Sequence, residues 1–298
     1  MNRDDLADLL AFATVAETES FTKAAAKIGV SQSALSQIVR RLEDRMDVRL
    51  LARTTRSVAP TPAGKRLLER LLPLFRGIDE GIAELGEYRD KPSGSIRITT
   101  VEHAAKTVLM PALARLLPAY PDIAVEVIID YGLADVVADR FDAGVRLGEH
   151  VAKDMIAVQI SPEIPMAIVA APEYLDAHPP PRSAKDLADH RCINLCLPAG
   201  NINAWRVVQR NRQARVRIAG PLTFNTIDLI LDASLLGLGM AYLPLDQVQG
   251  HLQSGRLVQV LTRSTPPLPA YHLYYPNRRH HLPAFRLLVD ALRYPRGT

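Results

Sequence analysis

The sequence lacks several features that mark other classes of protein. It has 2 cysteines in 298 residues, so the chain is not a disulfide-stabilised scaffold. It has no run of about 18 apolar residues, so no membrane span is expected. Its first residues do not resemble a signal peptide, because Asp4, Asp5 and Asp8 interrupt them. These absences lead us to expect a cytoplasmic protein.

Motifs of catalysis and metal binding are also missing. There is no glycine-rich phosphate loop, and neither Ser161 nor Ser234 lies in a nucleophile elbow. The histidines that could suggest a metal site are His272, His280 and His281. The charges of Arg278 and Arg279 would repel a cation there, and no cysteine or carboxylate has ligand spacing. We expect a solvated basic loop, no cofactor and no enzymatic activity.

The two cysteines, Cys192 and Cys196, could form a redox pair or be ordinary buried thiols. The stretch 191–198 is expected to be a strand, on which four residues span about 13 Å at 3.3 Å each. A disulfide tolerates a Cα separation of only about 7 Å. The spacing therefore favours two unpaired thiols.

The most informative feature that is present lies between residues 21 and 43. Apolar positions recur at helical spacing up to Gly29, which accepts the left-handed backbone of a helix end, and Ser31 is a good N-cap for the next helix. The expected buried stripe of that helix is Leu35, Ile38 and Leu42. Its opposite face has no acid and consists of Gln32, Ser33, Ser36, Gln37, Arg40 and Arg41. This joint pattern predicts a DNA-binding helix-turn-helix, with a surface helical hairpin as the alternative.

Positive charge concentrates around this motif. Residues 20–76 contain twelve lysines and arginines against four acids, a net charge of +8, whereas the whole chain carries +4. Such a local basic patch attracts a phosphate backbone. A short strand at 48–51, a turn at 53–57 and a return strand at Val58 then predict a wing, whose Arg53 and Arg56 could reach phosphates or a minor groove, or remain a solvated hairpin tip.

A long amphipathic helix is expected to begin at Pro62 and continue to about residue 88. At 1.5 Å per residue it would be about 38 Å long. Its leucine-rich stripe needs a cover, which a second subunit packed as an antiparallel helix pair would supply. Docking on its own domain is the alternative. Residues 91–95 then read as a linker.

Beyond the linker, expected strands and helices alternate, which indicates a parallel or mixed sheet flanked by helices. The expected strands are 95–101, 124–129, 143–147, 155–160, 166–170, 216–218, 240–243 and 272–275, and the helices 105–120, 227–236 and 283–293. Two proline-marked crossings, at 161–165 and 266–269, suggest two lobes with a ligand cleft between them.

These elements give three expected domains. They are a DNA-binding domain at 1–60, a linker and dimerisation helix at 61–90, and a ligand-binding domain at 91–298, in which lobe I comprises 94–161 and 268–298 and lobe II comprises 162–267. The fold class is therefore α/β multidomain.

The layout resembles a known family. The stretch LADLLAFATVAETESFTKAAAKIGVSQSALSQIVRRLEDRMDVRLLARTTRSVAPTPAGKRLL, at 6–68, is similar to the winged helix-turn-helix of LysR-type transcriptional regulators. The segments FDAGVRLGE at 141–149 and LLGLGMAYLP at 235–244 resemble that family's effector domain, which is similar to periplasmic binding proteins. The resemblance implies a homodimer or homotetramer that binds double-stranded promoter DNA, responds to a small-molecule effector and contacts RNA polymerase.

The resemblance also implies site residues. For DNA they are Gln32, Ser33, Ser36 and Gln37 at base edges, Ser31 and Arg40 nearer phosphates, and Arg53 and Arg56 in the wing. For the effector they are Thr99, Thr100, Val101, Glu102, Arg146, Phe224, Asn225 and Thr226. Thr100 could instead be an ordinary strand residue, and Arg146 could form a structural ion pair with Glu149 or Asp142.

One departure from the family concerns Glu102 and His103, where many relatives have small hydroxyl residues. A carboxylate facing the cleft disfavours a simple carboxylate effector unless Arg146 offsets it.

A second class of function competes with the regulator interpretation. A solute-binding or enzymatic α/β module could use its helical N-terminus for dimerisation alone. The basic segment at 20–76 and the missing export signal argue against this class.

Overall fold

The structure is a computed structural model that divides into two compact units, Met1–Leu85 and Gly86–Thr298. It describes residues 3–53, 58–84, 92–132, 136, 139, 141–148, 155–209, 212–276 and 282–295.

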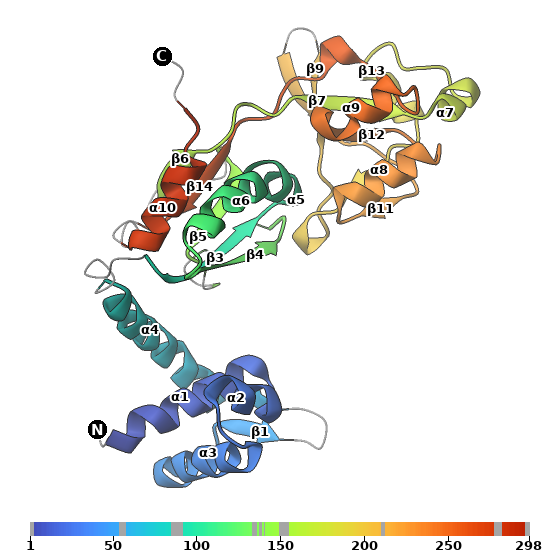
Figure 1. The fold of residues 1–298 in the computed structure, drawn as a ribbon. Helices are drawn as coiled ribbons and strands as arrows, with labels where there is room; N and C mark the ends of the chain where they lie inside the picture. Colours follow the sequence, from blue (N-terminus) through green and yellow to red (C-terminus); the bar gives the residue numbers. More distant parts are fainter. Residues whose placement is uncertain are drawn as a thin grey trace. The chain divides into compact units, whose positions relative to one another are not determined.

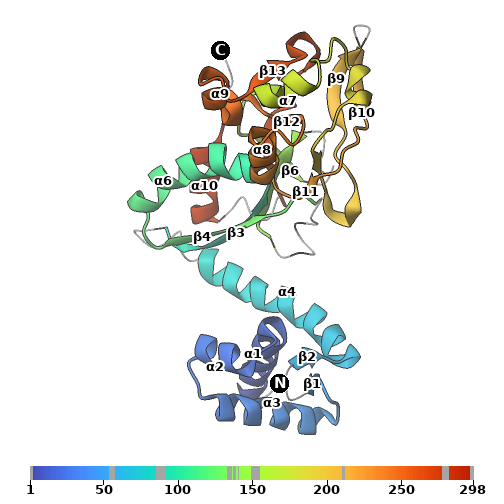
Figure 2. The ribbon, with the colours of Figure 1, turned by 90° about the vertical axis from the view of Figure 1, so that its right-hand side faces the viewer.

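The first unit is a winged helix-turn-helix, as predicted (Figure 2). Its elements are α1 (Arg3–Thr18), α2 (Phe21–Ile28), α3 (Gln32–Met46), β1 (Leu51–Arg53), β2 (Val58–Pro60) and α4 (Pro62–Glu84). The stripe that α3 buries is Leu35, Val39 and Leu42, whereas Ile38, expected there, is only partly buried. The spacing i, i+4, i+7 keeps these three side chains on one face, and Ile38 lies at its edge.

Local signals set the ends of α2 and α3. The Ser31 hydroxyl accepts the Ala34 N–H at 3.2 Å, which is the N-cap expected from the sequence. Gly29 has φ of 79°, a left-handed conformation that lets its N–H bond back to the Ala25 carbonyl. The tight turn between the two helices therefore follows from two neighbouring residues: Gly29 ends α2, and Ser31 begins α3.

The wing consists of β1 and β2, which pair antiparallel over three residue pairs from Leu51↔Pro60 to Arg53↔Val58. The first strand begins at Leu51, later than the strand expected at 48–51. Val48 is exposed and lies before this strand. Arg56 lies outside the described residues, and of Arg53 only the backbone is described.

The long helix α4 packs on its own unit along its first half. Leu71 is buried, and Leu67, Leu68 and Phe75 pack against the same core as α1 and α3. The alternative of docking on its own domain therefore holds for this half. Farther along, Leu74 and Ile78 are 64% and 47% exposed. The expected continuation to residue 88 lies outside the described residues.

The second unit contains a five-stranded mixed sheet in the order β4-β3-β5-β14-β6. Its strands are β3 (Gly94–Thr100), β4 (Ile123–Ile129), β5 (Ala143–Leu147), β6 (Ile156–Gln159) and β14 (Tyr271–Tyr275). Its helices are α5 (Glu102–Ala104), the π-helical turn η2 (Ala105–Leu109), α6 (Met110–Ala119) and α10 (Pro283–Leu292). We call this sheet with these helices lobe I (Figure 1).

Lobe II is built on a three-stranded antiparallel sheet in the order β12-β7-β13. Its strands are β7 (Met166–Ala170), β12 (Ala241–Pro244) and β13 (Val258–Val260), and its helices are α7 (Pro172–Ala177), α8 (Ile227–Leu235) and α9 (Leu245–Gln253). Two short pairs complete it: β9 (Trp205–Gln209) with β10 (Arg212–Val216), and β8 (Asn194–Leu195) with β11 (Thr223–Phe224). The strand expected at 216–218 is wrong in its bounds: β10 begins earlier and ends at Val216, and residues 217 and 218 lie outside it.

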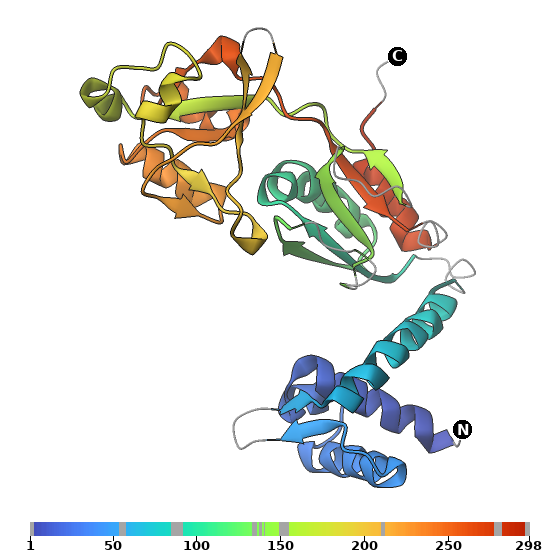
Figure 3. The ribbon, with the colours of Figure 1, turned by 180° about the vertical axis from the view of Figure 1, so that it is seen from behind.

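The chain passes between the lobes twice, at the two proline-marked crossings (Figure 3). The two crossing segments pair with each other through an antiparallel bridge between Ile164 and Leu268, whose N–H···O=C bonds are both 2.9 Å long. The return through the second crossing supplies β14, the strand between β5 and β6. The sequence pattern predicted this two-lobed topology. Among the described residues, none of the helices has the length and apolar character that a membrane span requires.

Candidate functional site

The first candidate site is the start of α3. Ser31, Gln32, Ser33, Gln37 and Arg40 are all exposed, and Ser36 is partly exposed. The Ser31 and Ser33 hydroxyls lie 3.0 Å apart, and the Thr22 hydroxyl donates to Gln32 Oε1 at 3.3 Å. These contacts restrict side chains at the tip of α3 before any ligand arrives, which lowers the entropy lost on binding.

Arg41 has a different role from its neighbours on α3. Its guanidinium bonds Asp8 of α1 at 2.6 Å, and Arg45 bonds the same carboxylate at 3.2 Å. Asp8 is 1% exposed, so this acid is buried and compensated by two arginines of α3. A third arginine, Arg49, pairs with the buried Glu43. Part of the basic charge of 20–76 therefore pairs with buried acids of the same unit, although the arginine side chains themselves remain exposed.

The second candidate site lies in lobe I, where β3 ends. Thr99 and Thr100 are fully buried, and Val101 is the residue before α5. Arg146 is 3% exposed; it donates to the carbonyls of Gly132 and Val145 and to the Thr99 hydroxyl at 2.7–3.1 Å. Burial lowers the pKa of this guanidinium. Arg146 thus ties the segment at Gly132 to the sheet.

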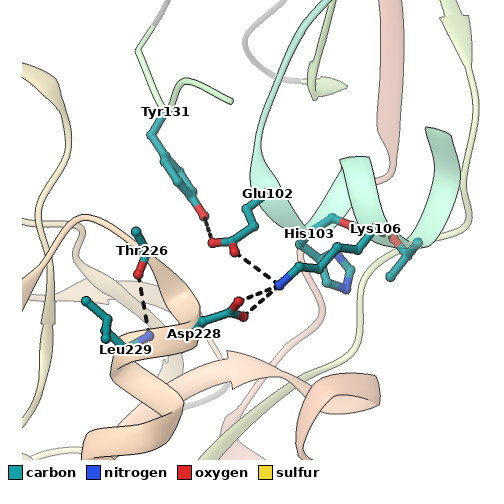
Figure 4. Close-up of polar contacts among 8 residues, drawn as sticks. Glu102, His103, Lys106, Tyr131, Thr226, Asp228 and Leu229 are labelled. Carbon is teal, nitrogen blue, oxygen red and sulfur yellow. Dashed lines mark hydrogen bonds and ion pairs between the residues drawn. The ribbon is translucent and has the colours of Figure 1, made fainter. Parts of the chain in front are cut away.

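A polar cluster joins the two lobes next to this point (Figure 4). Lys106 Nζ of η2 bonds both carboxylate oxygens of Asp228 on α8, at 2.6 and 2.8 Å, and Glu102 at 3.0 Å. The Tyr131 hydroxyl donates to the other oxygen of Glu102 at 3.4 Å. Two carboxylates thus share one ammonium, and we call these four residues the interlobe cluster.

The charges of the interlobe cluster support one another. The hydrogen bond from Lys106 lowers the pKa of Asp228, and the same bond raises the pKa of Lys106 against a smaller opposing effect of burial. Burial, with the nearby charge of Glu102, raises the pKa of Tyr131, so its phenol stays a proton donor. The shifts of Asp228 and Lys106 both favour the charged forms of the pair.

A second contact crosses between the lobes beside the cluster. His103 Nε2 lies 3.0 Å from both carboxylate oxygens of Asp246 in α9, and Nδ1 lies 3.1 Å from the Tyr271 hydroxyl of β14. Because a carboxylate only accepts, Nε2 donates, and in a neutral ring Nδ1 then accepts from the tyrosine. His103 is buried, whereas Asp246 is half exposed.

The predicted residues of lobe II lie at the start of α8. Phe224 ends β11, Asn225 is exposed, and Thr226 is the N-cap whose hydroxyl accepts the Leu229 N–H at 3.4 Å. Thr226 precedes Asp228 by half a helical turn, as Figure 4 shows. The structure thus brings the Thr226 end of lobe II and the Glu102 end of lobe I together.

Sequence reasoning missed Lys106, Tyr131, Asp228 and Asp246. A signal existed for Lys106, which follows Glu102 at the i, i+4 spacing of helical ion pairs. Asp228 is the acid in the first turn after a threonine cap, which is a favourable position near a helix N-terminus. Asp246 is likewise the acid in the first turn of its helix, α9, whereas Tyr131 carries no local signal of this kind.

The two cysteines are free. Cys192 is fully buried, which raises the pKa of its thiol to about 12. Cys196 is partly exposed, and the expected strand covers only Asn194–Leu195 between the two cysteines.

Trp205 is buried and stacks on Tyr242 with ring centroids 5.7 Å apart. In the part of the chain that is described, no group of three acids, histidines or cysteines could hold a metal ion; His280 and His281 lie outside it.

Comparison with known protein families gives two matches. Residues 6–65 match the family described as "Bacterial regulatory helix-turn-helix protein, lysR family", and residues 89–294 match "LysR substrate binding domain". Together these matches cover both units of the chain.

Similar proteins point the same way. HTH-type transcriptional regulator PgrR of Escherichia coli (strain K12) is 55% identical over 295 residues, which is 99% of each chain. A putative transcriptional regulator of Pseudomonas aeruginosa is 54% identical over 100% of this chain and 98% of its own. The full-length structure of the Vibrio cholerae virulence activator AphB has a TM-score of 0.67 at 27% identity, covering 97% of this chain and 98% of that one.

Proposed function

Because this chain belongs to the LysR family of transcriptional regulators, we propose that it reads promoter DNA with α3 and its wing and senses a small effector between its lobes. The observation that carries the first half is the exposed, acid-free start of α3. Gln32 and Gln37 pair with base edges there, because an amide can bond adenine bidentately. Ser31, Ser33, Ser36 and Arg40 complete the surface, and Arg53 and Arg56 contact phosphates from the wing.

The second half rests on the interlobe cluster. An effector bound beside Glu102, Val101 and Thr226 lies next to the Lys106–Asp228 contact and alters it. The lobes then favour a different arrangement, provided that the effector binds that arrangement better. In lobe I this site is supported by the buried residues Thr99, Thr100 and Arg146. In lobe II it is bordered by Phe224 and Asn225.

The remaining partners follow from the same function. The exposed Leu74 and Ile78 on α4 suit a second copy of the chain, so we propose a homodimer or homotetramer on a pseudo-palindromic site. Such a regulator works in the cytoplasm, where promoter DNA and RNA polymerase are. It needs no cofactor and catalyses no reaction.

A DNA-binding experiment tests this function. The full-length protein is used to select duplexes from a randomised pool, and the selected duplex is compared with a scrambled one. Replacing Gln32 or Gln37 with alanine should reduce discrimination between the two by about 1–3 kcal/mol, whereas Arg40→Ala should weaken binding to both duplexes alike. A wild-type protein that selects no duplex would refute the proposal.

The effector is sought separately. A thermal-shift screen of metabolites against the full-length protein should identify a compound that raises its melting temperature, because a ligand of the native state stabilises it. The same compound should change the affinity or the bend of the selected duplex.

A further inference from the structure

Glu43 is a buried carboxylate on the helix that carries the DNA-reading face. It lies near the end of α3 and is 2% exposed. One of its oxygens accepts the N–H groups of Leu50 and Leu51 at 2.8 and 3.0 Å, and the other accepts from Arg49 at 3.1 Å. A buried charge persists only when its hydrogen-bonding capacity is met, and here the chain entering the wing meets it.

The Leu50 peptide is bonded on its other side as well. Its carbonyl accepts the backbone N–H of Thr61 at 2.9 Å and the Thr61 hydroxyl at 3.3 Å. That hydroxyl also bonds the Arg49 carbonyl at 2.7 Å and accepts the N–H of Gly64, in the first turn of α4. A Cβ at Gly64 would overlap the Leu50 carbonyl. The start of β1 is thus held between α3 and α4.

The wing is held by packing and by hydrogen bonds at its base. Leu51 of β1 is buried in the core of the unit, and Val58 of β2 packs against that core. The two strands pair over three residue pairs, and a two-stranded hairpin is marginally stable alone. Because apolar packing is not directional, the direction of the wing relative to α3 depends on the hydrogen bonds at its base. Among those bonds, the two N–H groups that Glu43 accepts connect the wing directly to the helix that reads DNA.

We propose that Glu43 is a positioning residue for DNA binding, which sets the wing at a fixed distance and angle from the reading face of α3. The inference rests on the proposed DNA-binding function. Its consequence is that the wing arginines, Arg53 and Arg56, reach phosphates only when the Glu43 carboxylate holds the base of β1. Base reading by Gln32 and Gln37 does not need this bond.

Asp8 provides a matched control within the same unit. It is also a carboxylate that is 1% exposed, and it also bonds arginines of α3. Its partners, Arg41 and Arg45, join α3 to α1 and not to the wing. Loss of Asp8 therefore tests what general destabilisation of the unit does to DNA binding.

The test is the salt dependence of affinity for a duplex selected by the full-length wild-type protein. Each phosphate contact contributes about 0.9 to the slope of log affinity against log salt. Glu43→Ala should lower this slope by about two per protomer, since both wing contacts are lost, with the preference for the selected over a scrambled duplex retained. Glu43→Gln keeps an oxygen acceptor for the two N–H groups and should restore most of the slope. Asp8→Ala should leave the slope undiminished.

A variant cycle separates positioning from a merely structural role. The double variant Arg53→Ala/Arg56→Ala should have the same slope as Glu43→Ala, and adding Glu43→Ala to it should lower the slope no further. If Glu43→Ala is too unstable to purify, the milder Glu43→Gln must still show a lower slope than wild type. Three results overturn the inference and leave the DNA-binding function standing. The first is a wild-type slope in both Glu43 variants. The second is a further loss of slope when Glu43→Ala is added to the double arginine variant, and the third is an equal loss of slope in Asp8→Ala. A wild type that selects no duplex overturns both.

Discussion

The charged contacts that hold α3 and the ion pair that crosses between the lobes differ in how far they are buried. In the first unit, Asp8 and Glu43 are almost fully buried, and each bonds groups that fix α3 in place. In the second unit, the Lys106–Asp228 pair between the lobes is open to water: Lys106 is 48% exposed and Asp228 is 54% exposed. Buried, fully bonded charges define one geometry, whereas exposed ion pairs add little stability and are exchanged easily.

This difference suits the two tasks of a ligand-controlled regulator. A surface that reads base edges must hold its side chains in one arrangement, because a displaced helix loses its hydrogen bonds. A sensor must have two arrangements that differ by a few kcal/mol, so that a small ligand can shift the balance. The DNA-binding unit should therefore have one fixed geometry, whereas the two lobes should be able to change their arrangement.

The largest effect is expected at the start of α4. Gly64→Ala should reduce the free energy of unfolding of the first unit by about 3 kcal/mol, because the new Cβ meets the Leu50 carbonyl oxygen. Gly77→Ala, on the same helix but with open space around it, should instead gain about 0.5–1 kcal/mol. Urea denaturation measures both. Equal effects of the two substitutions on the free energy of unfolding would show that the first unit is not tightly packed around Gly64.

The next largest effect is the loss of unfolding free energy when one acid of each unit is removed. Asp8→Ala should cost about 2 kcal/mol, since it removes charge-assisted hydrogen bonds to a buried carboxylate. Asp228→Ala should cost less than about 0.5 kcal/mol, because its ion pair is exposed. Denaturation curves of the full-length variants give both numbers. A larger loss for Asp228 than for Asp8 would reverse the comparison.

A smaller effect is expected on effector affinity. Lys106→Met breaks the contact between the lobes and should change the affinity for the effector about fivefold, the lower end of usual coupling between linked equilibria. Arg97→Met is the matched control, because the Arg97–Glu126 pair has the same 2.6 Å length and similar exposure but lies within lobe I. Calorimetry with a compound found by thermal shift measures both. The same change in both variants would mean that the interlobe cluster has no special role.

The smallest effect concerns pH. The lowered pKa of Asp228 gives stability that is present above the ordinary value of 3.8 and is lost as pH falls through the lower folded value. The raised pKa of Lys106 gives stability that is present below 10.5 and is lost as pH rises through the higher folded value. The difference in melting temperature between wild type and Asp228→Asn should therefore be constant from about pH 5 to pH 9. A difference that disappears within this window would exclude the ion pair as its source.

The sequence predicted features whose signals are local. The caps at Ser31 and Gly29, the turn between α2 and α3 and the two proline-marked crossings are each encoded within a few neighbouring residues. The exposed face of α3 followed from helical periodicity alone. Arg41 is exposed, as predicted, but its pairing with Asp8 was not predicted, because an arginine that meets an acid on another helix looks the same in sequence as one that meets a phosphate.

The interlobe contacts could not be predicted in this way. Lys106 and Asp228 are 122 positions apart, and His103 and Asp246 are 143 positions apart. They meet only because the chain crosses between the lobes twice. Neither partner has a local pattern that identifies the other. The family resemblance therefore implied effector residues at Glu102 and Thr226 without Lys106, whose ammonium bonds Glu102 and Asp228.

Hydrogen exchange of backbone amides tests the contrast between the units most directly. The N–H groups of Leu50 and Leu51 bond the buried Glu43. Those of Leu229 and Gln247 bond the partly exposed Thr226 and the exposed Asp246, at the starts of α8 and α9. We predict that the first pair exchanges only with global opening of its unit, and that the second pair exchanges much faster, through local opening. Equal protection of the two pairs, or faster exchange at Leu50 and Leu51, would contradict a fixed reader joined to an adjustable sensor.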